Sequence, residues 1–506
     1  MDEKDNNAEI KGMYNLAYEL NPGNPYLLVK LLEYNPQLCN DKIVIRENIL
    51  KAVQSCYGDI HLRIESLKAY FTLGRLYLIL REDDKALCMY LKGIDLCVSE
   101  KVCYAKDIFD GEIHSLGRLK APAKAYPVID WIQTILTLTS CIKYSNLKQL
   151  DVLRKKNAIK KAFQSSVVIV AGGADSIVKS SANKYGSYLM EAVKKYEGTI
   201  LSGGTTSGVP GLLGTAVDYA RKNGNKKIEL IGYIPRNISK GTKVDKAYSI
   251  IKTIGREFSP LESIQMWTDL IASGIQPNDV RVLGIDGGSI AKIEYRLALS
   301  LGAHVGVVNE SGQVILDLLN DNEWSGHDKL RVLPNESESV WAFINHNIKS
   351  VLTSKQIEDT AKVIHENYVK EQNALKRDDL NLKSWDSLNS DLKKSNINQA
   401  IFICELLAST GYGMRKLQLD GKGIKNFSKD EITRMSKMEH GRFVAERLMN
   451  GWRYGPQKNI EKKISPYLIL WDELTEEIKQ YDVDAVVKFP ELLEAAGYEI
   501  YKMEGD

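Results

Sequence analysis

The sequence has no long apolar run, no closely spaced cysteine pair and no marked excess of charge of one sign. No run approaches the roughly 20 apolar residues needed to cross a bilayer, so we expect no membrane insertion. The seven cysteines form no CxxC pair, which argues against a metal site or a disulfide framework and favours a reducing cytosol. The first residues lack the basic and then apolar order of a secretory signal. We therefore expect a cytoplasmic protein without a metal or other cofactor.

Charge gives a further exclusion. The chain of 506 residues carries 65 acidic and 68 basic residues, for a formal net charge of +3. Such a balance provides no general attraction to nucleic acid, so direct nucleic-acid binding is not expected. At roughly 100–200 residues per domain, the length predicts three or four domains.

The first region, residues 1–155, has the apolar spacing of helices with short connections. Within 67–98, two helical stretches flank an acidic turn, and the small residues Gly74, Ala86 and Gly93 would let the helices approach closely. This spacing resembles one tetratricopeptide repeat, with a plain helical bundle as the alternative. Either arrangement predicts a scaffold that could bind a protein partner and that shows no chemistry.

Residues 160–350 have a different pattern, in which short β-branched runs alternate with amphipathic segments. Alternation of this kind predicts a parallel sheet covered by helices on both faces, here a doubly wound, Rossmann-like domain. The expected strands are 166–171, 199–202, 228–234, 280–285 and 304–308. The fold class predicted for the whole chain is therefore mixed, with an α/β domain between helical regions.

The last region contains an internal repeat. The residues WDSL at 385–388 recur as WDEL at 471–474, and the same shift of 86 residues relates Gly411 to Gly497. We interpret the region as a tandem pair of small helical modules, at 355–415 and 430–503.

Three glycine pairs each follow an expected strand directly. The pairs are Gly172-Gly173, Gly203-Gly204 and Gly287-Gly288. Parallel strands end at one edge of a sheet, where ligands bind in open α/β folds. Glycine lets backbone N–H groups approach a phosphate, and a following helix N-terminus adds a favourable dipole. No Gly-Lys-Ser/Thr follows these turns and their spacing is not GxGxxG, so neither known nucleotide-loop motif is present.

We therefore predict a phosphate-bearing ligand at these turns, with purely structural turns as the alternative. The candidate ligand-binding residues are Gly172, Gly173, Asp175, Ser176, Gly203, Gly204, Thr205, Thr206, Ser207, Gly208, Asp286, Gly287, Gly288 and Ser289.

Residues 166–345 resemble the SLOG superfamily, which includes the Lonely Guy phosphoribohydrolases and the cytosolic head of melastatin-type TRP channels. The resemblance rests on GGTTSGVPGLLG at 203–214 and on Glu294, six residues after Gly288. It implies loops that hold the phosphate and ribose of a nucleotide, and a catalytic pair of Glu294 and Arg256. Asp286 stands where the phosphoribohydrolases have a proline and would put a negative charge at the crevice unless it binds ribose hydroxyls. This departure from the phosphoribohydrolase pattern favours ligand binding without hydrolysis of the ligand.

The second tail copy, about 435–503, resembles the RyR domain through MEHGRF at 438–443, GWRYGP at 451–456 and WDEL at 471–474. A predicted ligand pocket, with aromatic rings for stacking and polar contacts, comprises Glu439, His440, Arg442, Trp452, Tyr454 and Trp471. The alternative is that these residues form the core of a short domain. That alternative is favoured for Trp471, because Trp385 is its equivalent in a copy without GWxYG, and His440 has a counterpart in His365.

The domain combination is similar to architectures assigned to bacterial antiviral and conflict signalling. We expect a sensor or effector that binds an ADP-ribose-like or cyclic nucleotide messenger and forms a homo-oligomer, as SLOG relatives commonly do. The rival hypothesis is a nucleotide N-glycosidase or phosphoribohydrolase that uses Glu294 and Arg256. A third is an interaction scaffold whose α/β domain has lost its ligand.

Overall fold

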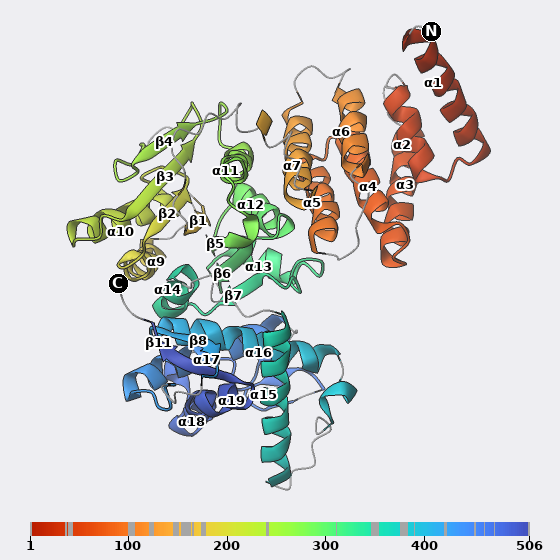
Figure 1. Cartoon of the computed structure of the whole chain (residues 1–506). Coiled ribbons are helices and arrows are strands. Elements are labelled where there is room, and N and C mark those ends of the chain that lie inside the picture. The colour runs from red at the N-terminus through yellow and green to blue at the C-terminus, as the bar shows by residue number, and fades with distance from the viewer. Residues whose placement is uncertain are drawn as a thin grey trace.

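The structure is a computed structural model (Figure 1). It describes residues 3–35, 38, 44–99, 107–120, 126–144, 151–152, 163, 166–173, 179–238, 242–309, 311–345, 354–374, 383–388, 390–418, 423–449, 452–459, 461–469 and 471–503. The described elements are a set of N-terminal helices, a central seven-stranded parallel sheet with helices, and a mostly helical C-terminal part. The predicted mixture of helical and α/β structure is therefore confirmed.

The N-terminal helices pack as neighbours along the chain. They are α1 (Glu3–Leu20), α2 (Pro25–Tyr34), α3 (Val44–His61), α4 (Ser66–Leu80), α5 (Asp83–Ser99), α6 (Asp107–Lys120) and α7 (Pro127–Tyr144). Gly74 and Gly93 lie where α4 and α5 meet. A Cβ at Gly74 would lie 2.4 Å from the Tyr90 ring, and one at Gly93 would lie 2.5 Å from the Phe71 ring. Both glycines thus permit the close helix contact that the sequence predicts, whereas the assignment as a tetratricopeptide repeat stays a prediction.

The central sheet has the strand order β4-β3-β2-β1-β5-β6-β7, and all neighbours are parallel. The strands are β1 (Val167–Gly172), β2 (Gly198–Ser202), β3 (Ile228–Ile234), β4 (Ile250–Thr253), β5 (Val280–Ile285), β6 (His304–Val308) and β7 (Leu330–Leu333). Val167 of β1 pairs with Thr199 on one side and Val280 on the other. The chain order therefore reverses at β1, the position at which open α/β sheets leave a crevice.

Helices cover both faces of this sheet (Figure 1). Three of them pack on the face that carries Val168 and Val170: α9 (Lys179–Val193), α10 (Gly208–Lys222) and α14 (Ser337–Asn345). Three others lie on the face that carries Val167 and Ile169: α11 (Leu261–Ala272), α12 (Ser289–Ser300) and α13 (Gln313–Asn320). The uniformly apolar β1 run is thus buried on both sides, as expected for a central parallel strand.

The N-terminal helices and the second face of the sheet share one hydrophobic core. α7 packs against α11, and α5 packs against α12. Figure 1 shows α11 and α12 between the sheet and these two helices. α11 and α12, which both begin near the carboxyl edge of the sheet, therefore also contact the N-terminal helices.

The C-terminal part contains α15 (Ser354–Ala374), η4 (Trp385–Ser387), α16 (Ser390–Ser409), β8 (Tyr412–Lys416), α17 (Lys429–Met449), β9 (Arg453–Tyr454), β10 (Ile464–Ser465), η5 (Trp471–Glu473), α18 (Glu476–Val487), α19 (Phe489–Ala495) and β11 (Tyr498–Lys502). β8 and β11 pair antiparallel, with Tyr412 opposite Lys502 and Tyr498 opposite Lys416. In the described chain, no helix combines the length and hydropathy needed to cross a membrane.

The internal repeat of the sequence is also a repeat of local structure. The His365 Nε2 donates to the Lys383 carbonyl oxygen at 2.7 Å, and the His440 Nε2 donates to the Ile469 carbonyl oxygen at 2.8 Å. Residues 383 and 469 are separated by the same 86 positions that relate the two tryptophans. Gly411 and Gly497 both have positive φ, at 81° and 83°.

Candidate functional site

Residues from all three glycine turns line one cavity of about 380 Å³ at the carboxyl ends of β1, β2 and β5. The predicted residues among its lining are Gly172, Gly173, Gly203, Thr205, Gly288, Ser289 and Glu294. The cavity lies beside β1, where the strand order reverses. Its volume is at the small end of the roughly 300–1,000 Å³ of ligand pockets.

Other predicted residues are placed elsewhere. Gly204, Thr206, Ser207, Gly208, Asp286, Gly287 and Arg256 are not among the lining residues, and Asp175 and Ser176 lie outside the described residues. Gly204 and Gly287 have φ values of 67° and 139°, so they form the turns rather than the cavity wall. The Thr206 hydroxyl donates to the Lys243 carbonyl oxygen at 3.4 Å.

The glycines that line the cavity differ in the structural reason for glycine at each position. At Gly172, a Cβ would lie 2.4 Å from the Ile285 carbonyl oxygen, so packing alone requires glycine there. At Gly288, a Cβ would meet no atom within 4 Å, and φ is −110°, which any residue adopts. Neither packing nor backbone conformation therefore explains Gly288, whereas the close approach of a ligand would.

The N-terminus of α12 faces the cavity. Gly288 is its N-cap and provides no side-chain cap, and Ser289, Ile290 and Ala291 of the first turn line the cavity. The first backbone N–H groups of a helix lack intrahelical acceptors and lie at the positive end of its dipole, which favours an anion. α10 differs, because its Val209 N–H donates to the Gly173 carbonyl oxygen at 3.1 Å.

Two carboxyl groups complete the wall. Glu294 was predicted, and Glu262, in the first turn of α11, was not. The Glu262 Oε2 accepts hydrogen bonds from the Ser259 N–H at 3.0 Å and from its hydroxyl at 3.3 Å. Ser259 and Glu262 have the spacing of a helix capping box, a signal that could have located the start of the helix but not the cavity.

Burial raises the pKa of both carboxyls. For Glu294 the pKa rises to about 7, because burial disfavours the charged form and the neighbouring Glu262 carboxylate repels it, while a hydrogen bond with Ser263 opposes the shift. Burial also raises the pKa of Glu262, and hydrogen bonds from its own backbone N–H and from Ser259 oppose that rise. None of the described lining residues is Lys, Arg or His. The cavity therefore has a positive end at α12 and an acidic wall.

Asp286 faces away from this cavity. It is buried with φ of 52°, its N–H donates to the Ser311 hydroxyl at 2.9 Å, and its carbonyl oxygen accepts from the Tyr295 hydroxyl at 2.6 Å. A Cβ at Gly312 would lie 1.6 Å from the Asp286 Oδ1, so the carboxylate packs against that glycine, just before α13. The structure thus brings no Asp286 charge to the crevice.

Arg256 is exposed and lies outside the cavity lining. Its carbonyl oxygen accepts a hydrogen bond from the Asn237 N–H at 2.8 Å. The structure therefore does not bring Arg256 to Glu294 as a pair across the cavity.

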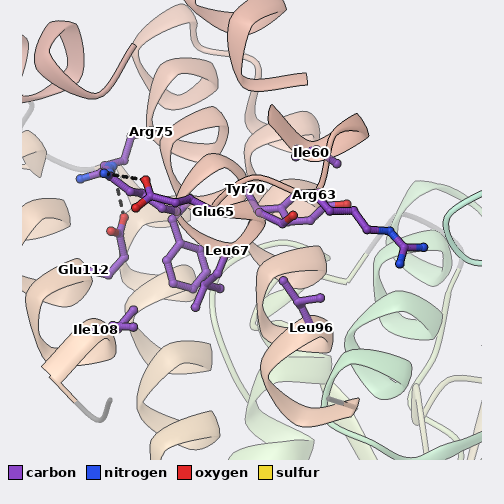
Figure 2. Close-up of a pocket in the computed structure, with 12 residues that line it drawn as sticks. Ile60, Arg63, Glu65, Leu67, Tyr70, Arg75, Leu96, Ile108 and Glu112 are labelled. Carbon is purple, nitrogen blue, oxygen red and sulfur yellow. Dashed lines mark hydrogen bonds and ion pairs between the residues drawn. The ribbon is translucent and has the colours of Figure 1, made fainter. Parts of the chain in front are cut away.

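A larger cavity, of about 770 Å³, lies among the N-terminal helices (Figure 2). The figure shows the Arg75 and Glu112 side chains facing each other, with 3.3 Å between the Arg75 Nε and the Glu112 Oε1. Arg75 also bonds Glu33 at 2.7 Å, and the Tyr90 hydroxyl donates to Glu112 at 2.6 Å. Because these buried charges pair with one another, we interpret them as a structural network rather than a ligand site.

In the C-terminal part, His440 has a packing role. Its side chain is buried and its Nε2 donates to the Ile469 carbonyl oxygen. Its ring packs edge-on against the Trp471 ring, with 5.9 Å between the ring centroids. His365 and Trp385 repeat this contact at 6.2 Å in the first copy. The arrangement supports a packing role for His440, whereas Trp471 is only partly buried and Trp385 is buried in the core.

The remaining candidates of the predicted RyR pocket have separate environments. Glu439 is buried and forms an ion pair with Arg442 at 2.7 Å. The Arg447 guanidinium lies over the Trp452 ring at 4.8 Å, and Tyr454 on β9 is 60% exposed. A ligand role for Trp452 and Tyr454 stays a prediction.

Comparison with known families supports the C-terminal assignment. Residues 424–502 match the family model of the RyR domain. The RyR-like character predicted for the second copy is therefore confirmed, and the match begins somewhat before the predicted boundary at 430. No curated protein matches the chain.

Proposed function

We propose that this protein is a sensor or effector that binds a nucleotide-derived small molecule, ADP-ribose-like or a cyclic nucleotide, at the carboxyl edge of its sheet. The observation that carries the proposal is the single cavity formed by Gly173, Gly203 and Gly288 with the uncapped N-terminus of α12. We extend it to a SLOG-like, Rossmann-like domain over 160–350, supported by the reversal of strand order at β1. A homo-oligomer in bacterial antiviral signalling is the setting we propose.

The chemistry of the cavity favours a phosphate at one end. The positive end of α12 and the nearby glycine backbones suit an anion, and Gly288 leaves room for it. The acidic wall disfavours a second phosphate beside Glu262 and Glu294, so any second phosphate of the ligand would lie outside this part of the cavity. The proposed ligand therefore places its phosphate at Gly288 and its uncharged part toward Glu294.

A route from the cavity to the rest of the molecule supports a sensor. α11 and α12 line the cavity and pack against α7 and α5. Polar contacts also join α5 to the segment between α13 and β7: Lys92 forms an ion pair with Glu323 at 3.1 Å, and the His327 Nε2 lies 2.9 Å from the Asp95 Oδ1. A ligand that shifts these helices would alter the surface that the N-terminal helices offer to a partner.

The first test identifies the ligand. Purified full-length protein is denatured, and any released nucleotide is identified by mass spectrometry; AMP, ADP-ribose and cyclic dinucleotides are then titrated by calorimetry. Gly288→Val is the matched variant, because a side chain there enters the cavity without meeting protein atoms within 4 Å of its Cβ. We expect it to lose ligand binding and keep the wild-type melting temperature. Wild-type protein that binds none of these compounds, or a valine variant that binds them unchanged, would refute the proposal.

One observation favours a second candidate, N-glycosidic hydrolysis. A pKa of about 7 leaves Glu294 partly protonated at neutral pH, as a general acid requires. Arg256, the partner that the resemblance implies, is exposed outside the cavity lining. Incubation with nucleoside monophosphates and NAD distinguishes the candidates: base release abolished by Glu294→Gln supports the enzyme, and binding without release supports the sensor. If the protein neither binds nor cleaves these compounds, the interaction scaffold is the remaining hypothesis.

A further inference from the structure

Glu262 has an unpartnered oxygen in the cavity wall. Glu262 is 5% exposed, and its Oε2 already accepts hydrogen bonds from Ser259. Its Oε1 is buried and has no hydrogen-bond partner in the described chain. A buried acceptor left unpaired costs roughly 1–3 kcal/mol, and more when charged, so this atom needs an explanation.

Among the described residues, no side chain donates a hydrogen bond to Oε1. The Glu262 backbone N–H, like Ser259, opposes the rise in the pKa of the carboxyl, and a Cβ at Gly255 would lie 3.9 Å from Oε1. The described cavity wall has no Lys, Arg or His, and the other carboxyl, Glu294, repels Glu262. A ligand in the cavity is therefore the candidate partner for this oxygen.

The kind of donor follows from the two ends of the cavity. The first turn of α12 suits a phosphate, and Glu262 presents an acceptor from the facing helix α11. A sugar phosphate carries hydroxyl donors close to its anionic group, and a hydrogen bond to a carboxylate is stronger than one between neutral groups.

We infer that Glu262 is the sugar-recognition residue of this cavity, whose free Oε1 accepts a hydrogen bond from a ribose hydroxyl of the ligand. The inference rests on the proposed nucleotide binding and adds to it a preference for ribose over deoxyribose. A ligand without that hydroxyl would leave Oε1 buried and unpaired, whereas the ribose compound satisfies it.

The test is a double-mutant cycle between protein and ligand on the full-length chain. Calorimetry compares AMP with 2′-deoxy-AMP and 3′-deoxy-AMP, on wild-type protein and on Glu262→Gln. Glutamine keeps an oxygen for the Ser259 cap and puts an amide nitrogen at the position of Oε1. We expect the wild type to bind AMP about tenfold or more tightly than one deoxy compound, and Glu262→Gln to lose most of that preference. Glu257→Gln, a change at an exposed acid outside the lining, should keep it.

Each alternative outcome has a distinct meaning. If the wild type binds no nucleotide, the proposed function fails and this inference fails with it. If AMP binds but the losses from Glu262→Gln and from the deoxy sugar are additive, sugar recognition by Glu262 is refuted while nucleotide binding stands. Tighter binding by Glu262→Gln, or wild-type binding that requires Mg²⁺, would equally refute it, because Glu262 would then face the phosphate or a cation. A melting temperature near the wild-type value shows that the variant is folded.

Discussion

Glu294→Gln should stabilise the protein increasingly as the pH rises. The unfolded carboxyl has the ordinary pKa of 4.5, and burial raises the folded pKa to about 7. Between these values the folded protein binds the proton more tightly, so the wild type loses stability as pH rises from about 5 toward 8. Glutamine resembles the protonated carboxyl and cannot ionise, so the variant lacks this loss.

The magnitude follows from the shift. A change of about 2.5 pKa units corresponds to about 3 kcal/mol, since one unit is about 1.36 kcal/mol. The variant should therefore match the wild type near pH 5 and exceed it by about 3 kcal/mol near pH 8. For a domain of this size, about 3 kcal/mol corresponds to a melting-temperature difference of roughly 6–12 °C.

The assay is thermal unfolding of the full-length wild type and variant from pH 5 to pH 8, at constant ionic strength. The difference between the two proteins cancels the titration of groups that do not interact with Glu294; Glu262, which repels Glu294, is the exception. Glu191→Gln on the opposite face, at an exposed position of α9, is the control and should follow the wild type at every pH. Parallel profiles for wild type and Glu294→Gln would refute the buried, proton-retaining carboxyl.

Four further variants test separate placements. Gly172→Ala should lower the free energy of unfolding by about 1–3 kcal/mol, and the melting temperature with it, because its Cβ would lie 2.4 Å from a backbone oxygen of β5. An unchanged melting temperature would contradict that packing. Arg256→Ala should leave the calorimetric affinity for nucleotide unchanged, and a large loss would place Arg256 at the ligand after all. His440→Ala should cost roughly 1–3 kcal/mol in thermal unfolding, because the buried His440 side chain is lost and the partly buried Ile469 carbonyl loses its donor, whereas Tyr454→Ala should stay within about 0.5 kcal/mol. Equal effects of these last two changes would refute the packing role of His440.

The sequence predicts the sheet because local pattern and position agree there. The run around Val168 is apolar at every residue, which only a strand buried on both faces requires. The edge strands β4 and β7 fall outside the predicted ranges, because each has four residues and exposes part of its surface to solvent. Convergence of the glycine turns follows from parallel strands alone, and the cavity lining bears that geometry out.

The side chains of the cavity could not be predicted as well as its backbone. Asp286 precedes Gly287 in sequence, yet its left-handed φ turns the carboxylate toward Gly312. Glu262 is 24 positions before Asp286, and its place in the wall depends on how α11 packs beside α12. Such contacts between separate elements leave no spacing signal in one sequence.

The tail shows the opposite case, in which repetition within one sequence stands in for a comparison between proteins. A tryptophan that recurs without the GWxYG segment is better explained by packing, and Trp385 and Trp471 each lie next to the histidine of their copy, with ring centroids 6.2 and 5.9 Å apart. Residues present in one copy only, such as Trp452 and Tyr454, have no such explanation from the repeat. These residues are therefore the ones to test for a function specific to the second copy.

The position of the two carboxyls connects binding with the rest of the molecule. Glu262 is in the first turn of α11 and Glu294 is in α12, so a ligand that bonds both fixes the two helices relative to each other. The same helices pack against α7 and α5, in a core shared with the N-terminal helices. Because close-packed helices move as units, a change between α11 and α12 must be accommodated between α5 and α7. On the proposed function, the N-terminal helices are therefore the region whose arrangement reports occupancy of the cavity.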